Sequence, residues 1–169
     1  MKTISIALLT MALTMAGPVA ARTVGPSPLL GSWAVEVEKL PIPPEARPKS
    51  VTLTFTQSAD QRWSTRVVII GGDGSERRMS SSYTTDGTPV KIDGDTQEAD
   101  TAAVRLPTPD VLILALGKGG IPASTRIYAL APGGNEMIET AVYFGDDGKP
   151  VMRTNHFTRI GTEQARIAP

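Results

Sequence analysis

The sequence predicts an all-β domain: an up-and-down antiparallel meander of eight or nine strands closed into a β-barrel. Short segments alternate residue by residue between apolar and polar side chains, which is the period of a half-buried strand. Glycine and proline, 16 and 14 of the 169 residues, fall between those segments and mark frequent turns. No segment keeps a helical period. Because a long meander leaves bare edges unless it closes, a barrel is expected.

The expected strands follow one another with turns between them. Segment 33–38 alternates from Trp33 onward, and 51–56 places its apolar side chains on one face and three threonines on the other. Segment 111–116 is apolar at every position, which indicates burial on both faces or an apolar interior. The other strands are expected at 62–70, 76–84, 101–106, 124–130, 136–144 and 151–160, and a short additional strand is expected at 90–92.

A proline-rich connection follows the first strand. Segment 40–49 contains four prolines, and proline cannot donate a ladder hydrogen bond. We expect an extended loop there, either a lid over one end of the barrel or a plain connection.

The first 21 residues read as a secretory signal peptide. Lys2 gives a positive start, 4–16 is apolar, and small residues precede a cleavage site after Ala21. The apolar run is shorter than the roughly 20 residues that cross a bilayer, so we expect no membrane span. The mature protein is therefore expected to be periplasmic or secreted, and its polar C-terminal tail, 161–169, is expected to fray.

Charge and cysteine content narrow the function. Lys plus Arg equals Asp plus Glu, 17 of each, so there is no basic excess for a nucleic-acid partner. The absence of cysteine removes disulfides, thiolate nucleophiles and sulfur-ligated metals. Aspartates beside glycines are explained by turn chemistry, so we expect no metal site and no cofactor. The oligomeric state is left open.

A family resemblance rests on both ends of the domain. Gly31 and Trp33 form a Gly-x-Trp motif on the first strand, and Arg159 lies on the last. Together with the meander, this pattern over 22–160 resembles lipocalin-like (calycin) barrels, in particular small exported bacterial proteins of unassigned function. The resemblance implies a lipocalin-like barrel in which Gly31, Trp33 and Arg159 are structural. It suggests a ligand cavity and implies no reaction.

His156 is the only histidine and the candidate general base. Glu139, on the preceding strand, is the candidate partner that would orient it. The alternative is an ordinary polar residue on a barrel strand, since few domains carry a catalytic dyad.

Charged residues within predicted strands are the candidate ligand contacts: Arg66, Arg126, Arg153 and Glu139, with Tyr128 as a further candidate. A charge inside a barrel is costly unless it is paired or binds an opposite charge. An inward arginine would therefore anchor a carboxylate or phosphate. The alternative is that these side chains point outward to water.

Three functions remain open. The first is an exported protein that binds a small apolar or amphipathic ligand in its barrel. The second is a barrel enzyme, of isomerase, cyclase or hydrolase type, with His156 as base; the sequence leans against an enzyme. The third is an envelope interaction or stress protein without a ligand, for which an exposed apolar patch would be the sign.

Overall fold

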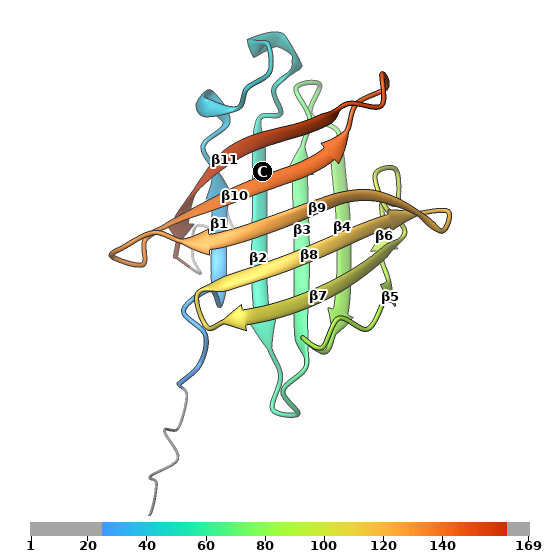
Figure 1. Ribbon diagram of the computed structural model, residues 1–169. Helices are drawn as coiled ribbons and strands as arrows, with labels where there is room; N and C mark the ends of the chain where they lie inside the picture. Colours follow the sequence, from blue (N-terminus) through green and yellow to red (C-terminus); the bar gives the residue numbers. More distant parts are fainter. Residues whose placement is uncertain (1–24, 162–169) are drawn as a thin grey trace, which may run out of the picture.

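The computed structural model describes residues 25–161, so the expected signal peptide and the tail beyond Gly161 lie outside the described residues. These residues form one antiparallel sheet (Figure 1), in the order β5-β7-β8-β9-β10-β11-β1-β2-β3-β4-β6. The strands are β1 (Gly31–Val35), β2 (Ser50–Gln57), β3 (Trp63–Ile70), β4 (Glu76–Tyr83), β5 (Val90–Lys91), β6 (Asp93–Gly94), β7 (Thr101–Thr108), β8 (Val111–Lys118), β9 (Ile121–Leu130), β10 (Glu136–Phe144) and β11 (Pro150–Ile160).

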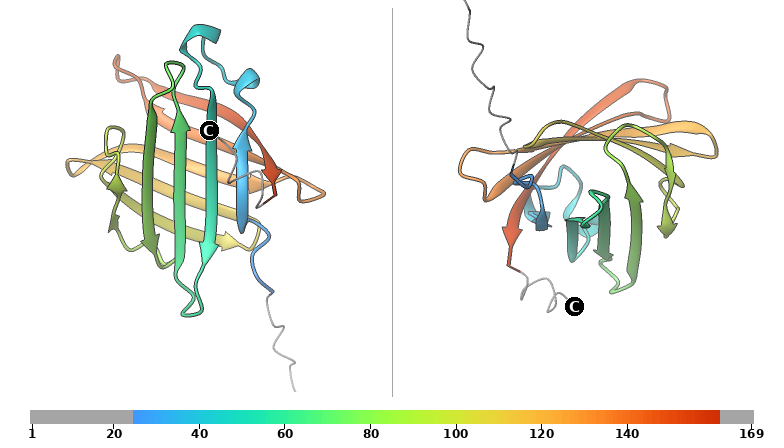
Figure 2. Two further views of the ribbon diagram at one scale, coloured as in Figure 1. Left: turned by 180° about the vertical axis from the view of Figure 1, so that it is seen from behind. Right: turned by 90° about the horizontal axis from the view of Figure 1, so that it is seen from below.

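The sheet wraps into a nearly closed barrel in which β1–β4 form one wall and β7–β11 the other (Figure 2). The first strand, β1, pairs with the last, β11, and this pairing joins the two walls. On the side opposite the β1–β11 pairing, β6 pairs with β4 and β5 pairs with β7. Segment 90–94, which contains both short strands, therefore narrows the gap between β4 and β7. The predicted barrel is confirmed. Eleven strands stand where eight or nine were expected, because two of them are two residues long.

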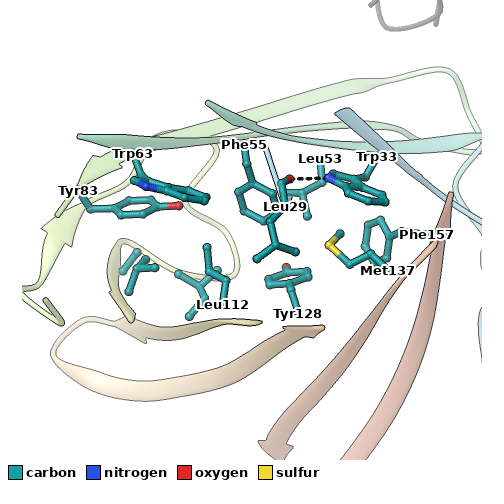
Figure 3. Close-up of a cluster of buried hydrophobic side chains, with 13 residues drawn as sticks. Leu29, Trp33, Leu53, Phe55, Trp63, Tyr83, Leu112, Tyr128, Met137 and Phe157 are labelled. Carbon is teal, nitrogen blue, oxygen red and sulfur yellow. Dashed lines mark hydrogen bonds between the residues drawn. The ribbon is translucent and has the colours of Figure 1, made fainter. Parts of the chain in front are cut away.

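Alternation along each strand sends one set of side chains inward and fills the base of the barrel, the end at which β1 begins. Leu29, Trp33, Phe55 and Tyr83 are at most 1% exposed, and Figure 3 shows them with their neighbours across the interior. The ring of Tyr128 lies 5.7 Å edge-on from Phe55 and 6.1 Å from Phe157. This end therefore holds side chains rather than open space.

A clamp of Trp33 and Arg159 closes the base. The Arg159 guanidinium lies 4.0 Å from the centre of the Trp33 ring and donates hydrogen bonds to the carbonyl oxygens of Pro28, Leu30 and Gly134. Gly31 has φ +120°, and a Cβ there would lie 2.9 Å from an Arg159 nitrogen. Glycine is thus required beside the clamp for both conformation and space.

The opposite end, the mouth, is crossed by the proline-rich connection between β1 and β2. It contains two 3-10 turns, η1 (Val37–Lys39) and η2 (Pro44–Ala46). Arg47 holds the segment together by donating to the carbonyl oxygens of Leu40 (3.2 Å) and Ile42 (3.1 Å). Within residues 25–161 no helix has both the length and the apolar character needed to cross a membrane.

Candidate functional site

A cavity of about 210 Å³ lies inside the barrel, between the packed base and the mouth. Most of its wall is aliphatic, from Val35, Val51, Val67, Ile69, Leu114 and Leu116. Leu40, from the proline-rich connection, completes this wall. Part of that connection therefore covers the mouth. It contains two 3-10 turns rather than the extended loop expected from its prolines, and Pro44 begins the second turn.

The remaining wall is polar and is built on the inner faces of β9, β10 and β11. Strand register places inward residues of these three strands side by side, so they form rows across the wall. From base to mouth the rows are Leu130–Met137–Phe157, Tyr128–Glu139–Asn155, Arg126–Ala141–Arg153 and Ser124–Tyr143–Val151. The first row is thus apolar, the second and third carry the charged side chains, and the last is uncharged. We call this the inner polar wall.

Glu139 is the centre of this wall. Its side chain is 4% exposed, and one carboxylate oxygen accepts a 2.9 Å hydrogen bond from Arg126 Nη1. The other oxygen accepts a 2.6 Å bond from Asn155 Nδ2. The second Arg126 terminal nitrogen pairs with Glu98, from the loop before β7. Both oxygens of the buried Glu139 carboxylate therefore have a hydrogen-bond donor.

The ionisation of the wall follows from this pairing. Burial acts to lower the pKa of Arg126, but the negative charges of Glu139 and Glu98 outweigh burial and leave the pKa of Arg126 raised. Burial raises the pKa of the Tyr128 hydroxyl well above its ordinary value, and the Glu139 charge raises it further. At neutral pH the wall thus offers a fixed cation and a protonated hydroxyl.

Arg153 differs from Arg126 in having no carboxylate within ion-pair distance in the described part of the chain. Its guanidinium carbon lies 5.1 Å from the centre of the Tyr143 ring. The Nε atom is buried and has no hydrogen-bond partner among residues 25–161. Both arginines line a further hollow of about 240 Å³ at the mouth, together with Glu98, Ser124 and Tyr143. An unmatched cation therefore faces this hollow.

The structure separates the sequence-predicted residues into two groups. Arg126, Arg153, Tyr128 and Glu139 meet on the inner polar wall. Arg66 is exposed on the outer face of β3.

His156 also lies outside the barrel. It is paired with Ile138, whereas Glu139 is paired with Asn155, so His156 and Glu139 point to opposite sides of the sheet. The structure does not bring the candidate base and its partner together.

Sequence reasoning missed two members of the site. Asn155 could have been found, because alternation along β11 places it on the same face as Val151 and Phe157, which are apolar. Glu98 carries no such signal, because it lies in a loop whose path is decided by the closing of the barrel.

A larger hollow, of about 610 Å³, lies at the base of the barrel, between the N-terminal segment and the β2–β3 and β7–β8 connections. It is wider than the interior cavity, but no charged side chain is among its lining residues and it opens to solvent. Ligand sites in proteins combine apolar enclosure with a few convergent polar groups. That description fits the interior cavity.

A nearly closed meander, a Trp–Arg clamp at the base and a cavity inside define a calycin-type β-barrel. Among solved structures, the chain is similar to wild-type fluorescent protein UnaG, with 14% identity, a TM-score of 0.51, and coverage of 78% of this chain and 96% of that chain. An Asn-to-Ala mutant of UnaG gives 14% identity, a TM-score of 0.55, and coverage of 79% and 97%. At this identity the likeness shows the fold alone. No protein-family model matches the chain, and the comparison with curated proteins found no match.

Proposed function

We propose that this protein binds a small amphipathic molecule inside the barrel. The observation that carries the proposal is the division of one interior cavity into an aliphatic wall and the inner polar wall. The similarity to UnaG is consistent with a barrel that holds a small molecule. The cavity volume of about 210 Å³ lies below the roughly 300–1,000 Å³ of sites for drug-sized ligands, so the ligand is small.

The lack of an ion-pair partner for Arg153 favours an anionic polar group on the ligand, although Arg126 and Arg153 are equal in number to Glu139 and Glu98. Arg126 is matched by Glu139 at 2.9 Å, whereas Arg153 meets no carboxylate among the described residues. A carboxylate at the mouth would pair with the Arg153 guanidinium, with the Ser124 hydroxyl in the same hollow. The apolar part of the ligand would then extend toward Leu114 and Val67.

We also propose that the protein is exported to the periplasm or secreted. The support is the charged start, apolar run and small-residue site within 1–21. Intact-mass spectrometry of the protein recovered from its host is expected to show a chain that begins at Arg22. Recovery of a chain that keeps Met1 would contradict export by this signal.

The enzyme alternative loses its geometric support, because His156 lies on the outer face and does not line the cavity. A base must come within hydrogen-bond reach of the proton it removes.

Titration calorimetry with three eight-carbon probes tests the proposed binding. Octanoate, 1-octanol and octylamine share one chain and differ in the polar group. We expect octanoate to bind most tightly and octylamine most weakly, because Arg153 is the charge on the wall that has no ion-pair partner among the described residues. Replacing Ile69, which lines the cavity, by Trp is expected to lower octanoate affinity at least tenfold by filling the space.

The matched control is Val68→Trp, one residue along β3 on the outer face, which should leave binding unchanged. Arg153→Met should remove the preference for octanoate over octanol and leave octanol binding intact. Failure of all three probes to bind saturably, or equal binding by the Ile69→Trp and Val68→Trp variants, would contradict the cavity as the site.

A further inference from the structure

The outer surface of the β7–β11 wall carries no charged side chain over most of its area. Figure 1 looks onto this surface, which we call the outer apolar face. By strand alternation its members are the outward residues within 101–103 of β7, 111–117 of β8, 121–129 of β9, 138–144 of β10 and 150–156 of β11. Within these ranges His156, at one corner, is the only titratable outward residue, and the exposed, outward Arg105 of β7 and Glu136 of β10 border the face. By contrast, the outer surface of β3 and β4 carries Arg66, Glu76 and Arg78.

The sequence of β8 agrees with a covered outer face. Leu112 and Leu114 point into the barrel and are buried, while Ile113, between them, points outward. A strand that is apolar at every position is typical of a sheet buried on both sides. In the isolated chain one side of β8 remains uncovered.

Exposed large hydrophobic side chains gather on the same wall. Among the described residues four are prominent: Ile121 (70% exposed), Ile138 (37%), Phe144 (72%) and Met152 (69%). All four lie on the strands of the outer apolar face. Contiguous apolar surface of this kind marks an interaction site in a soluble protein.

The face has a knob at one edge and a hollow at the other. Met152 and Phe144 project from the β10–β11 edge. At the β7–β8 edge a shallow hollow of about 280 Å³ is lined by Ala103, Ala115 and Gly117. Register places Ala115, Thr125, Val142 and Met152 in one row across the wall, so knob and hollow stand at the same height along the strands.

We propose that the partner of this face is a second copy of the chain, packed face to face about a two-fold axis parallel to the strands. Rotation about such an axis leaves the position of each residue along the strand direction unchanged and places the β10–β11 edge of one copy opposite the β7–β8 edge of the other. Met152 and Phe144 of each copy therefore meet the hollow of the other. An isologous contact of this kind requires a self-complementary surface. The lack of charge removes the like-charge repulsion that a symmetric contact otherwise creates.

The area of the face is sufficient for a dimer. Strand spacing and rise give about 600 Å² of outward surface per copy and about 1,200 Å² for the pair, the lower limit of specific interfaces. We therefore expect a dimer that dissociates in the micromolar range. This dimer does not depend on the proposed ligand.

Sedimentation velocity of the mature chain from about 1 to 200 µM tests the proposal. We expect a concentration-dependent shift from monomer to dimer. Met152→Lys and Phe144→Glu should each weaken association at least tenfold. Both side chains are about 70% exposed, so these variants should fold normally, which far-UV circular dichroism checks. The matched control is Thr52→Lys on the outer face of β2, which should leave association unchanged.

A cysteine cross-link gives a second measurement, because the natural chain has no cysteine. Thr125, outward on the central strand β9, lies near the proposed axis, so Thr125→Cys should form a disulfide-linked dimer under mild oxidation while Thr52→Cys should not. A monomer at every concentration, or a dimer that Met152→Lys and Phe144→Glu leave intact, would overturn the proposal. So would a monomer that co-floats with phosphatidylcholine vesicles, which would assign the face to a lipid surface.

Discussion

Replacing Trp33 by alanine is expected to lower the free energy of unfolding by about 3–5 kcal/mol, the range for removing a large buried aromatic side chain. Trp33 is fully buried, and its indole nitrogen donates a 2.9 Å hydrogen bond to the Leu29 carbonyl oxygen. The same ring supports the Arg159 guanidinium at 4.0 Å. Its removal therefore opens a cavity and loosens the clamp that closes the base. Urea denaturation followed by far-UV circular dichroism measures the loss.

Trp33→Phe separates the contribution of the aromatic ring from that of the indole hydrogen bond. This variant keeps an aromatic ring under Arg159 but cannot donate to the Leu29 carbonyl oxygen. We expect the phenylalanine variant to lie between the wild type and the alanine variant. A loss below about 1 kcal/mol for Trp33→Ala would mean that the base is held by something other than this clamp.

Replacing Arg126 by methionine is expected to destabilise the protein by about 3 kcal/mol, as when one partner of a buried ion pair is removed. The Glu139 side chain is 4% exposed, so its carboxylate would lose the 2.9 Å bond to Arg126 without gaining water. Asn155 alone would remain as its donor. Denaturation of the single variant measures this loss.

The double variant Arg126→Met with Glu139→Gln completes a thermodynamic cycle. We expect it to recover much of the lost stability, because the uncompensated charge is gone and the amide oxygen can still accept from Asn155. Arg66→Met, at an exposed outward position, is the matched control and should change stability by less than about 0.5 kcal/mol. A double variant no more stable than Arg126→Met would show that the pair acts through packing rather than charge.

Much of the fold could be read from the sequence, because each strand carries its own in-out period. Segment 51–56 shows this: Leu53 and Phe55 are buried inside, as their alternation with threonines indicates. The short strand expected at 90–92 is β5, but nothing in the sequence indicated β6 or the strands with which the two pair. Both short strands form because the gap between β4 and β7 has to be bridged, which is a property of the closed barrel.

The candidate site was predictable only in part. Arg126, Arg153 and Glu139 could be named as charges within strands, but whether a strand charge points in or out depends on which face is enclosed. For β10 both faces carry apolar residues, so its local pattern leaves Glu139 undecided. Whether Glu139 lies beside Asn155 depends on the register between β10 and β11. A shift of one residue would place the two side chains on opposite faces of the sheet.

The sequence by itself determined the strand-turn rhythm and an aliphatic interior, because these follow from the local preferences of neighbouring residues. Only the tertiary structure decided that the inner polar wall lines a cavity, that His156 lies outside, and that the outer surface of the same wall carries almost no charge. Each of these depends on which strands are brought side by side and how the sheet curves, and both are set by the closing of the whole barrel.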